Sequence, residues 1–242
     1  MTTPSPRTDR SLLMIAARSP IAGETKTRLG VAIGMDQAAA LYRSFLKDIA
    51  DRFDSEAEAE SRPYDLAWTF SPPDRDFAAD LEATIGRPAP FTTMFVPQSG
   101  PDWNTRQLNL LRWGEEHGYA RTVLMASDSP HLLPGVVVSA FRTLETRDVA
   151  IGRVRDGGYY LIGLRGFADV LSTARMSTDL AADGVILAAV SLGLTVGETE
   201  PTFDVDEVSD LAMLIEVLRN DPERRLATWQ TLLNLGLVRN SY

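Results

Sequence analysis

The stretch LLMIAARSPIAGETKTRL, residues 12–29, decides the fold class of this chain. Its first six residues form a continuous apolar run, which is typical of a strand buried on both faces of a parallel sheet. The run gives way to a polar segment that contains Gly23, Lys26 and Arg28. Because loops that bind ligands commonly follow strands of this kind, we predict a first strand over Leu12–Ala17 and a binding loop directly after it.

Further strands and helices are predicted to alternate along the chain. The predicted strands cover residues 65–70, 91–96, 122–126, 149–152, 159–164 and 194–196. The predicted helices cover residues 35–53, 77–85, 104–116, 136–144, 180–192, 206–218 and 223–237, and an acidic linker is expected over 54–63. This alternation predicts an α/β fold, with one three-layer α/β/α domain over residues 12–242 and a mostly parallel, doubly wound sheet.

The composition excludes several classes of function. The 242 residues carry a formal net charge of −9, which argues against nucleic acid as a partner because a polyanion would be repelled. The absence of cysteine excludes disulfides, thiolate metal sites and a cysteine nucleophile, and it fits a cytoplasmic protein. Residues 1–11 are polar, so we expect a disordered leader, with neither a signal peptide nor a membrane span. The apolar last helix, with Leu232, Leu233, Leu235 and Leu237, allows a homodimer.

Acidic residues gather at two places far apart in the sequence. Asp128 directly follows an apolar strand in the segment SDSP, and Asp204 and Asp206 lie in the segment DVD near the C-terminus. Alternate residues of an extended chain face opposite ways, so the economical prediction takes one metal ligand from each segment, Asp128 and Asp206. Carboxylate oxygens suit Mg²⁺ or Mn²⁺ that bridges a diphosphate. The alternative for each carboxylate is the cap of a turn or helix.

The segment DGGYYL, residues 156–161, predicts a hairpin turn between two strands. Its adjacent glycines let a ligand approach the backbone closely. Asp156 could act as a base toward an acceptor hydroxyl or position that hydroxyl, and Tyr159 or Tyr160 could form a pocket wall. The alternative is a hairpin with no role in binding.

Several common catalytic motifs are absent from the sequence. The first loop lacks the GxxxxGK[ST] pattern of a P-loop, and neither GxGxxG nor GxSxG occurs in the chain. The two histidines, His117 and His131, are too few for a multi-histidine zinc site. Lys26 and Arg28 could still hold a phosphate through side-chain and backbone donors, or they could be surface cations.

Taken together, these segments resemble the bacterial GT-A-like family of nucleotide-diphospho-sugar transferases of unknown function, relatives of the molybdenum cofactor and phospholactate guanylyltransferases. The resemblance spans residues 12–218 and rests on AARSPIAGETKTRL, SDSP, DGGYYLIGL and DVDEVSDL. The chain departs from the family at GPDWNTR, which keeps only Arg106 of the usual Gly-Asp-Leu-Gly-Glu-Arg stretch. It also has Glu207 and Val208 where the family usually has Thr-Pro.

The resemblance implies a role for each candidate residue. Asp128 and Asp206 would bind the metal, Lys26 and Asp156 would act in catalysis, and Tyr159 would face the acceptor together with Asp156. The residues implied to contact the nucleotide are Ala17, Arg18, Gly23, Lys26, Arg28, Arg106, Gly157, Gly158 and Tyr159.

Three functions follow as hypotheses. The first is a Mg²⁺- or Mn²⁺-dependent transferase that moves the glycosyl group of a nucleoside-diphosphate sugar to a small acceptor. The second is a nucleotidyltransferase that joins a nucleoside triphosphate to an acceptor phosphate and releases pyrophosphate. The third is a nucleotide-binding protein without turnover, which the altered GPDWNTR and DEVSD segments bring into consideration.

Overall fold

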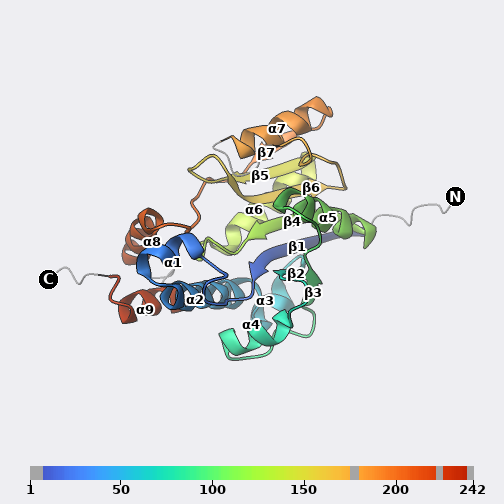
Figure 1. Ribbon diagram of the computed structural model, residues 1–242. Coiled ribbons are helices and arrows are strands. Elements are labelled where there is room, and N and C mark those ends of the chain that lie inside the picture. Colours follow the sequence, from blue (N-terminus) through green and yellow to red (C-terminus); the bar gives the residue numbers. More distant parts are fainter. Residues whose placement is uncertain (1–7, 175–179, 222–225, 239–242) are drawn as a thin grey trace.

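The structure, a computed structural model, describes residues 8–174, 180–221 and 226–238, and its centre is one seven-stranded sheet (Figure 1). The strands are β1 (Thr8–Arg18), β2 (Asp65–Ser71), β3 (Met94–Pro97), β4 (Tyr119–Ala126), β5 (Val149–Arg153), β6 (Tyr159–Arg165) and β7 (Val196–Glu198). Their order is β3-β2-β1-β4-β6-β5-β7, and β6 runs antiparallel to both of its neighbours while the other pairs are parallel. The predicted α/β class and mostly parallel sheet are confirmed.

Helices cover both faces of the sheet and complete the three layers (Figure 1). The helices are α1 (Thr27–Ile33), α2 (Met35–Phe53), α3 (Glu56–Ser61), α4 (Phe77–Ile85), α5 (Trp103–Glu116), α6 (Pro134–Thr146), α7 (Ala181–Ser191), α8 (Val208–Asn220) and α9 (Ala227–Asn234). One face carries α2, α4, α6, α8 and α9, and the opposite face carries α5 and α7. No helix among the described residues is both long enough and apolar enough to cross a membrane.

The alternation of side chains along β1 explains why both faces are covered. Leu13 and Ile15 pack into the core under α2, and Leu12 and Met14 pack into the core under α5. All four side chains are fully buried, as expected for a parallel strand between two helical layers. Because β1 lies between β2 and β4, its carboxyl end lies in the interior of the sheet, where ligands bind in folds of this class.

Several boundaries differ from the predictions. β3 starts at Met94 and not at residue 91, and β4 starts at Tyr119 and not at residue 122. β1 begins at Thr8, so residues 8–11 are strand and not leader, while residues 1–7 lie outside the described part of the chain. The segment expected to be a basic loop contains α1, which starts directly after Lys26. The predicted acidic linker contains α3, and Ser55 caps it by accepting a hydrogen bond from Glu58 N. Helix α8 starts at Val208, two residues after the predicted start.

The last helix, which was expected to offer its leucines to a partner chain, packs against α2 of the same chain. Leu232 is fully buried in the core beneath α2, and Leu233 and Leu235 are half-buried. Residues 223–225 of the predicted helix lie outside the described part of the chain, and α9 ends at Asn234, before the predicted end at residue 237. Leu232 therefore serves this chain's own core, and the homodimer stays a prediction.

Asp48 of α2 caps α9 across the core. Its two carboxylate oxygens accept hydrogen bonds from Ala227 N at 2.6 Å and Thr228 N at 3.0 Å, and the side chain is fully buried. Asp48→Ala should lower the free energy of unfolding by about 1–3 kcal/mol, because two donors at the start of α9 lose their partner. Urea denaturation measures this. Asp51→Ala, on the same helix but at the surface, should change stability by less than about 0.5 kcal/mol, and equal losses in both variants would contradict the capping role.

Candidate functional site

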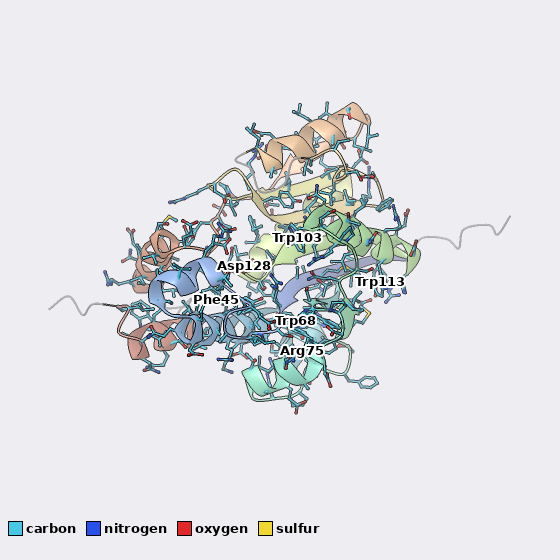
Figure 2. All side chains as sticks on the ribbon, viewed as in Figure 1. Phe45, Trp68, Arg75, Trp103, Trp113 and Asp128 are labelled. Carbon is cyan, nitrogen blue, oxygen red and sulfur yellow. The ribbon has the colours of Figure 1, made fainter. Side chains whose placement is uncertain are left out.

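Two cavities lie side by side at the carboxyl ends of β1 and β4. The first cavity has a volume of about 340 Å³ and is lined by the end of β1 and the loop before α1. The second cavity has a volume of about 400 Å³ and is lined by the β5–β6 hairpin and the segment before α8. The residues that line both cavities are Arg28, Trp103, Ala126, Asp128 and Asp206, of which Trp103 and Asp128 are labelled in Figure 2.

Lys26 lies at the junction of the two cavities and pairs with both predicted metal ligands. Its ammonium group forms an ion pair with Asp128 and another with Asp206 at 2.8 Å, and its side chain is only 5% exposed. Burial alone would lower the pKa of Lys26, but the attraction of Asp128 and Asp206 outweighs burial and raises it. Lys26 therefore stays charged and acts as a donor of hydrogen bonds, not as a base.

The backbone at Lys26 explains how the side chain reaches this position. Lys26 has φ 48° and ψ 42°, the left-handed conformation, and it is the residue that precedes α1. This conformation is unfavourable for a residue with a side chain, and such strain is concentrated at functional sites. The turn directs the ammonium group inward, toward Asp128 after the carboxyl end of β4 and Asp206 in the segment before α8.

Hydrogen bonds hold the DVD segment against the SDSP segment. Val205 N donates to Asp128 O at 3.0 Å, and Ser129 Oγ donates to Phe203 O at 2.7 Å. The His131 ring stacks on Phe203 with ring centroids 4.1 Å apart. Two segments separated by more than 70 residues therefore form one rigid wall, and this wall brings the carboxylates of Asp128 and Asp206 together.

Neither predicted metal ligand serves as a helix cap. Helix α8 is capped by Glu207 and Asp210, and Asp210 Oδ2 also accepts hydrogen bonds from the backbone N of Asp206 and Glu207 at 3.0 and 2.7 Å. Leu133, which has no capping side chain, precedes α6. The carboxylates of Asp128 and Asp206 are thus directed to Lys26 and the cavities.

Asp204 also lines the second cavity, which the sequence analysis did not predict. Contrary to the prediction for an extended chain, Asp204 and Asp206 both line this cavity, because the chain at 204–206 lies outside any regular strand. Burial raises the pKa of Asp204 to about 6, and repulsion from Asp206, Asp156 and Asp128 adds to this effect. Four carboxylates therefore converge on the edge of one cavity.

The donor set fits a divalent cation that is held partly by substrate. Among the described residues, no three histidine, cysteine or acidic side chains form a complete metal cage. Carboxylates at the junction outnumber the cations Lys26 and Arg28, so added positive charge would favour the binding of a diphosphate there. Mg²⁺ commonly takes one or two protein carboxylates and completes its shell with phosphate oxygens and water. Asp128 and Asp206 could supply those two ligands.

Asp204→Asn should stabilise the metal-free protein at high pH. The pKa of Asp204 lies near 6 in the folded state and near 4 in the unfolded state, so the neutral form favours folding. That contribution is fully present below about pH 4 and is lost as the pH rises through 6. In EDTA, Asp204→Asn should therefore gain about 1–3 kcal/mol at pH 8 and almost nothing at pH 4. Urea denaturation at both pH values measures this, with the exposed Asp74→Asn as control; a loss of stability at pH 8 would contradict it.

The first cavity gathers most of the predicted nucleotide contacts. Ala17, Arg18 and Arg106 line it together with Lys26 and Arg28. Arg106 Nε donates to Gly100 O at 3.0 Å, which fixes the guanidinium at the rim. The buried hydroxyl of Tyr42 accepts a hydrogen bond from Arg18 N at 3.0 Å and lies 2.8 Å from Ser127 Oγ. Tyr42 thus ties the end of β1 to the end of β4 and forms part of the cavity wall, a role that the sequence did not predict.

Two of the predicted nucleotide contacts lie elsewhere. Gly23 is exposed in the loop before α1 with φ 80°, and it lines neither of the two cavities. Gly157 has φ 87° and forms the hairpin turn, where its carbonyl accepts a hydrogen bond from Ala182 N at 3.0 Å. Both glycines serve the shape of the backbone, so their contact with a nucleotide has no geometric support.

The second cavity contains the remaining predicted residues, Asp156, Gly158 and Tyr159. Asp156 Oδ1 accepts a hydrogen bond from Gly158 N at 3.0 Å, which orients the carboxylate at the tip of the hairpin. The Tyr159 hydroxyl donates to Gln107 Oε1 at 3.1 Å, and burial raises the pKa of Tyr159 so that it stays protonated. Gln107 was not predicted, because a glutamine within an amphipathic helix carries no signal of function.

Comparison with known proteins identifies relatives of the whole chain. Residues 59–178 match the family described as "Uncharacterized protein conserved in bacteria (DUF2064)". A crystal structure described as a "putative nucleotide-diphospho-sugar transferase" from Desulfovibrio desulfuricans G20 is 32% identical in sequence, with a TM-score of 0.83. The similarity covers 95% of this chain and 96% of that one.

More distant structures share the fold alone. A 4-diphosphocytidyl-2C-methyl-D-erythritol synthase from Anaerococcus prevotii DSM 20548 has a TM-score of 0.54 at 11% identity, over 87% of this chain and 96% of that one. A nucleotidyl transferase from Methanothermobacter has a TM-score of 0.53 at 13% identity, over 88% of this chain and all of that one. A search of curated proteins found no significant match.

Proposed function

The chain belongs to the bacterial DUF2064 family, within the superfamily of nucleotide-diphospho-sugar transferases and nucleotidyltransferases, and we propose that it is a Mg²⁺- or Mn²⁺-dependent glycosyltransferase. The observation that carries the proposal is the position of Lys26, between Asp128 and Asp206 where a cationic and an acidic cavity meet. The relative at 32% identity is described as a nucleotide-diphospho-sugar transferase, which supports the same reading.

The first cavity is suited to the nucleoside-diphosphate sugar. Arg18, Lys26 and Arg106 line it, and guanidinium and ammonium groups are the usual partners of phosphate oxygens. A divalent cation held by Asp128 and Asp206 would neutralise charge on the diphosphate as it departs. Lys26 would donate a hydrogen bond to the same diphosphate, so the chain's own charge is placed where negative charge develops.

The second cavity is suited to the acceptor, because it shares Asp128 and Asp206 with the first cavity and is also lined by Asp156. In the proposed reaction, an acceptor hydroxyl oxygen forms a bond to the anomeric carbon of the donor sugar. The bond between that carbon and the phosphate oxygen breaks, and its electron pair stays on the nucleoside diphosphate. The hydroxyl proton passes to the carboxylate of Asp156, which lines this cavity.

Nucleotidyl transfer is the second candidate. The cluster of Arg18, Lys26, Arg28 and Arg106 along the first cavity would also suit a nucleoside triphosphate. In that reaction an acceptor phosphate oxygen attacks the α-phosphorus, and pyrophosphate leaves. The two reactions therefore differ in what they release and in the charge of the acceptor.

The products decide between the candidates. The purified protein is incubated with Mg²⁺ or Mn²⁺ and either nucleoside-diphosphate sugars or nucleoside triphosphates, and nucleoside diphosphate and pyrophosphate are measured. We expect nucleoside diphosphate from a sugar donor, released slowly by water alone and faster with an acceptor. Pyrophosphate as the sole product would favour nucleotidyl transfer, and thermal stabilisation by nucleotide without any product would favour a binding protein.

A further inference from the structure

The charged groups of the second cavity disfavour an anionic acceptor. Asp128, Asp156, Asp204 and Asp206 line it, and Arg28 is the one cation among the described lining residues. Arg28 is already paired, with Asp206 Oδ2 at 2.7 Å and with Glu207 Oε1 at 3.3 Å. With Asp128 and Asp206 assigned to the divalent cation and Arg28 already paired, a phosphate or carboxylate on the acceptor would still meet the carboxylates of Asp156 and Asp204 without an unpaired side-chain cation to offset them.

Gln107 presents a buried donor that lacks a partner in this cavity. The side chain lies on α5, is only 1% exposed and lines the second cavity. Its Oε1 accepts the hydrogen bond of the Tyr159 hydroxyl, so Nε2 is the end of the amide that is left for a ligand. Among the described residues, Nε2 has no hydrogen-bond partner. A buried amide donor of this kind is costly unless a ligand oxygen satisfies it.

The remaining walls of the cavity are largely apolar. Trp103, Leu124, Val154, Tyr159 and Ala181 line it together with the polar groups. Trp103 is 38% exposed at the start of α5 and is shared with the first cavity. Apolar and aromatic walls with a few convergent polar groups are typical of small-molecule sites, and they match the C–H faces of a sugar ring.

We propose that the second cavity selects an uncharged, polyhydroxylated acceptor, a free sugar or polyol, through Gln107 and Asp156. One acceptor hydroxyl oxygen accepts a hydrogen bond from Gln107 Nε2, and the hydroxyl that attacks the donor gives its proton to Asp156. This proposal rests on the proposed glycosyl transfer, and it makes Gln107 a positioning residue for the acceptor.

The first test compares matched acceptors. The sugar donor is first identified by its slow hydrolysis in Mg²⁺ or Mn²⁺. The release of nucleoside diphosphate from this donor is then measured with three uncharged acceptors, glycerol, glucose and myo-inositol, and with their phosphorylated counterparts, glycerol 3-phosphate, glucose 6-phosphate and inositol phosphate. At least one uncharged compound should raise the release of nucleoside diphosphate, and its phosphorylated counterpart should give a kcat/KM at least about tenfold lower. Equal or better use of the phosphorylated compounds overturns the acceptor proposal while leaving glycosyl transfer intact. Failure to hydrolyse any sugar donor overturns the proposed function itself, and the acceptor proposal with it.

The second test removes the unpaired donor. Gln107→Leu removes both ends of the amide, and Gln107→Glu keeps an oxygen for Tyr159 but replaces Nε2, so it is the variant of choice if Gln107→Leu folds poorly. Either folded variant should raise the KM for the uncharged acceptor about tenfold, and the KM for the donor much less. Gln230→Leu removes an exposed amide on α9 and is the matched control. An unchanged acceptor KM, or equal rises in the KM of donor and acceptor, would overturn the role of Gln107.

Discussion

Replacing Asp128 with asparagine should abolish nearly all turnover of the sugar donor. Asp128 pairs with Lys26, lines both cavities and is 35% exposed, so it is accessible to a cation that arrives with the diphosphate. Asparagine keeps the size of the side chain but removes the charge that binds the cation and orients Lys26. We expect kcat/KM to fall about 10²–10³-fold, the range seen when one electrostatic element of a transition state is lost.

The measurement separates the loss of the metal from the loss of the fold. Stabilisation by nucleoside diphosphate plus Mn²⁺ should largely vanish in Asp128→Asn, while the variant should stay folded without ligands, because Lys26 keeps its pair with Asp206 at 2.8 Å. Asp74→Asn, an exposed acid away from both cavities, is the control and should behave as the parent. If Asp128→Asn keeps the metal-dependent stabilisation and the activity, the shared-site proposal is wrong.

Elements with strong local signals could be predicted from the sequence. Helices α2 and α4 have the predicted bounds, because their apolar residues recur at helical spacing on the face that is buried in the core. Helix α3 was missed although a signal was present, since Ser55 followed by Glu58 is the pattern of a capped helix start. Helix α1 gave a weaker signal, because its stability depends on the burial of Leu29 in the core.

The pieces of the candidate site were predictable, but their mutual arrangement was not. Asp128 and Lys26 stand out because each follows a buried strand, and the carboxyl ends of neighbouring parallel strands meet at one edge. The pairing of Lys26 with Asp206 bridges 180 residues and depends on the left-handed turn at Lys26. Asp204 was missed because its position depends on an irregular segment of the chain. Gln107 was missed because its role depends on a hydrogen bond from Tyr159 on another element.

Replacing Lys26 with methionine should reduce kcat about 10²–10³-fold. It should also leave the carboxylates of Asp128 and Asp206 to repel each other. Methionine matches the length of the lysine stem but has no charge, so Asp128 and Asp206 lose the ammonium group between them. Burial works to raise the pKa of Asp206, and the attraction of Lys26 and Arg28 normally keeps it below its ordinary range. Without Lys26, the pKa of Asp206 should rise. The metal-free protein should lose about 1–3 kcal/mol of stability at neutral pH, and the loss stays in this range because water partly solvates both carboxylates.

The two effects of Lys26→Met can be separated by adding a divalent cation with nucleoside diphosphate. A cation between Asp128 and Asp206 should restore stability, because it supplies the missing positive charge, but it should not restore kcat, because the donor to the departing diphosphate is still absent. Lys26→Arg should also stay impaired, since a planar guanidinium does not fit a site shaped for a compact ammonium group. Lys47→Met, which removes the other lysine of the sequence, a half-buried residue of α2 paired with Asp51, is the control. If Lys26→Met, assayed with saturating Mg²⁺ or Mn²⁺, kept the kcat of the parent, Lys26 would be assigned to the structure of the metal-free protein and not to catalysis.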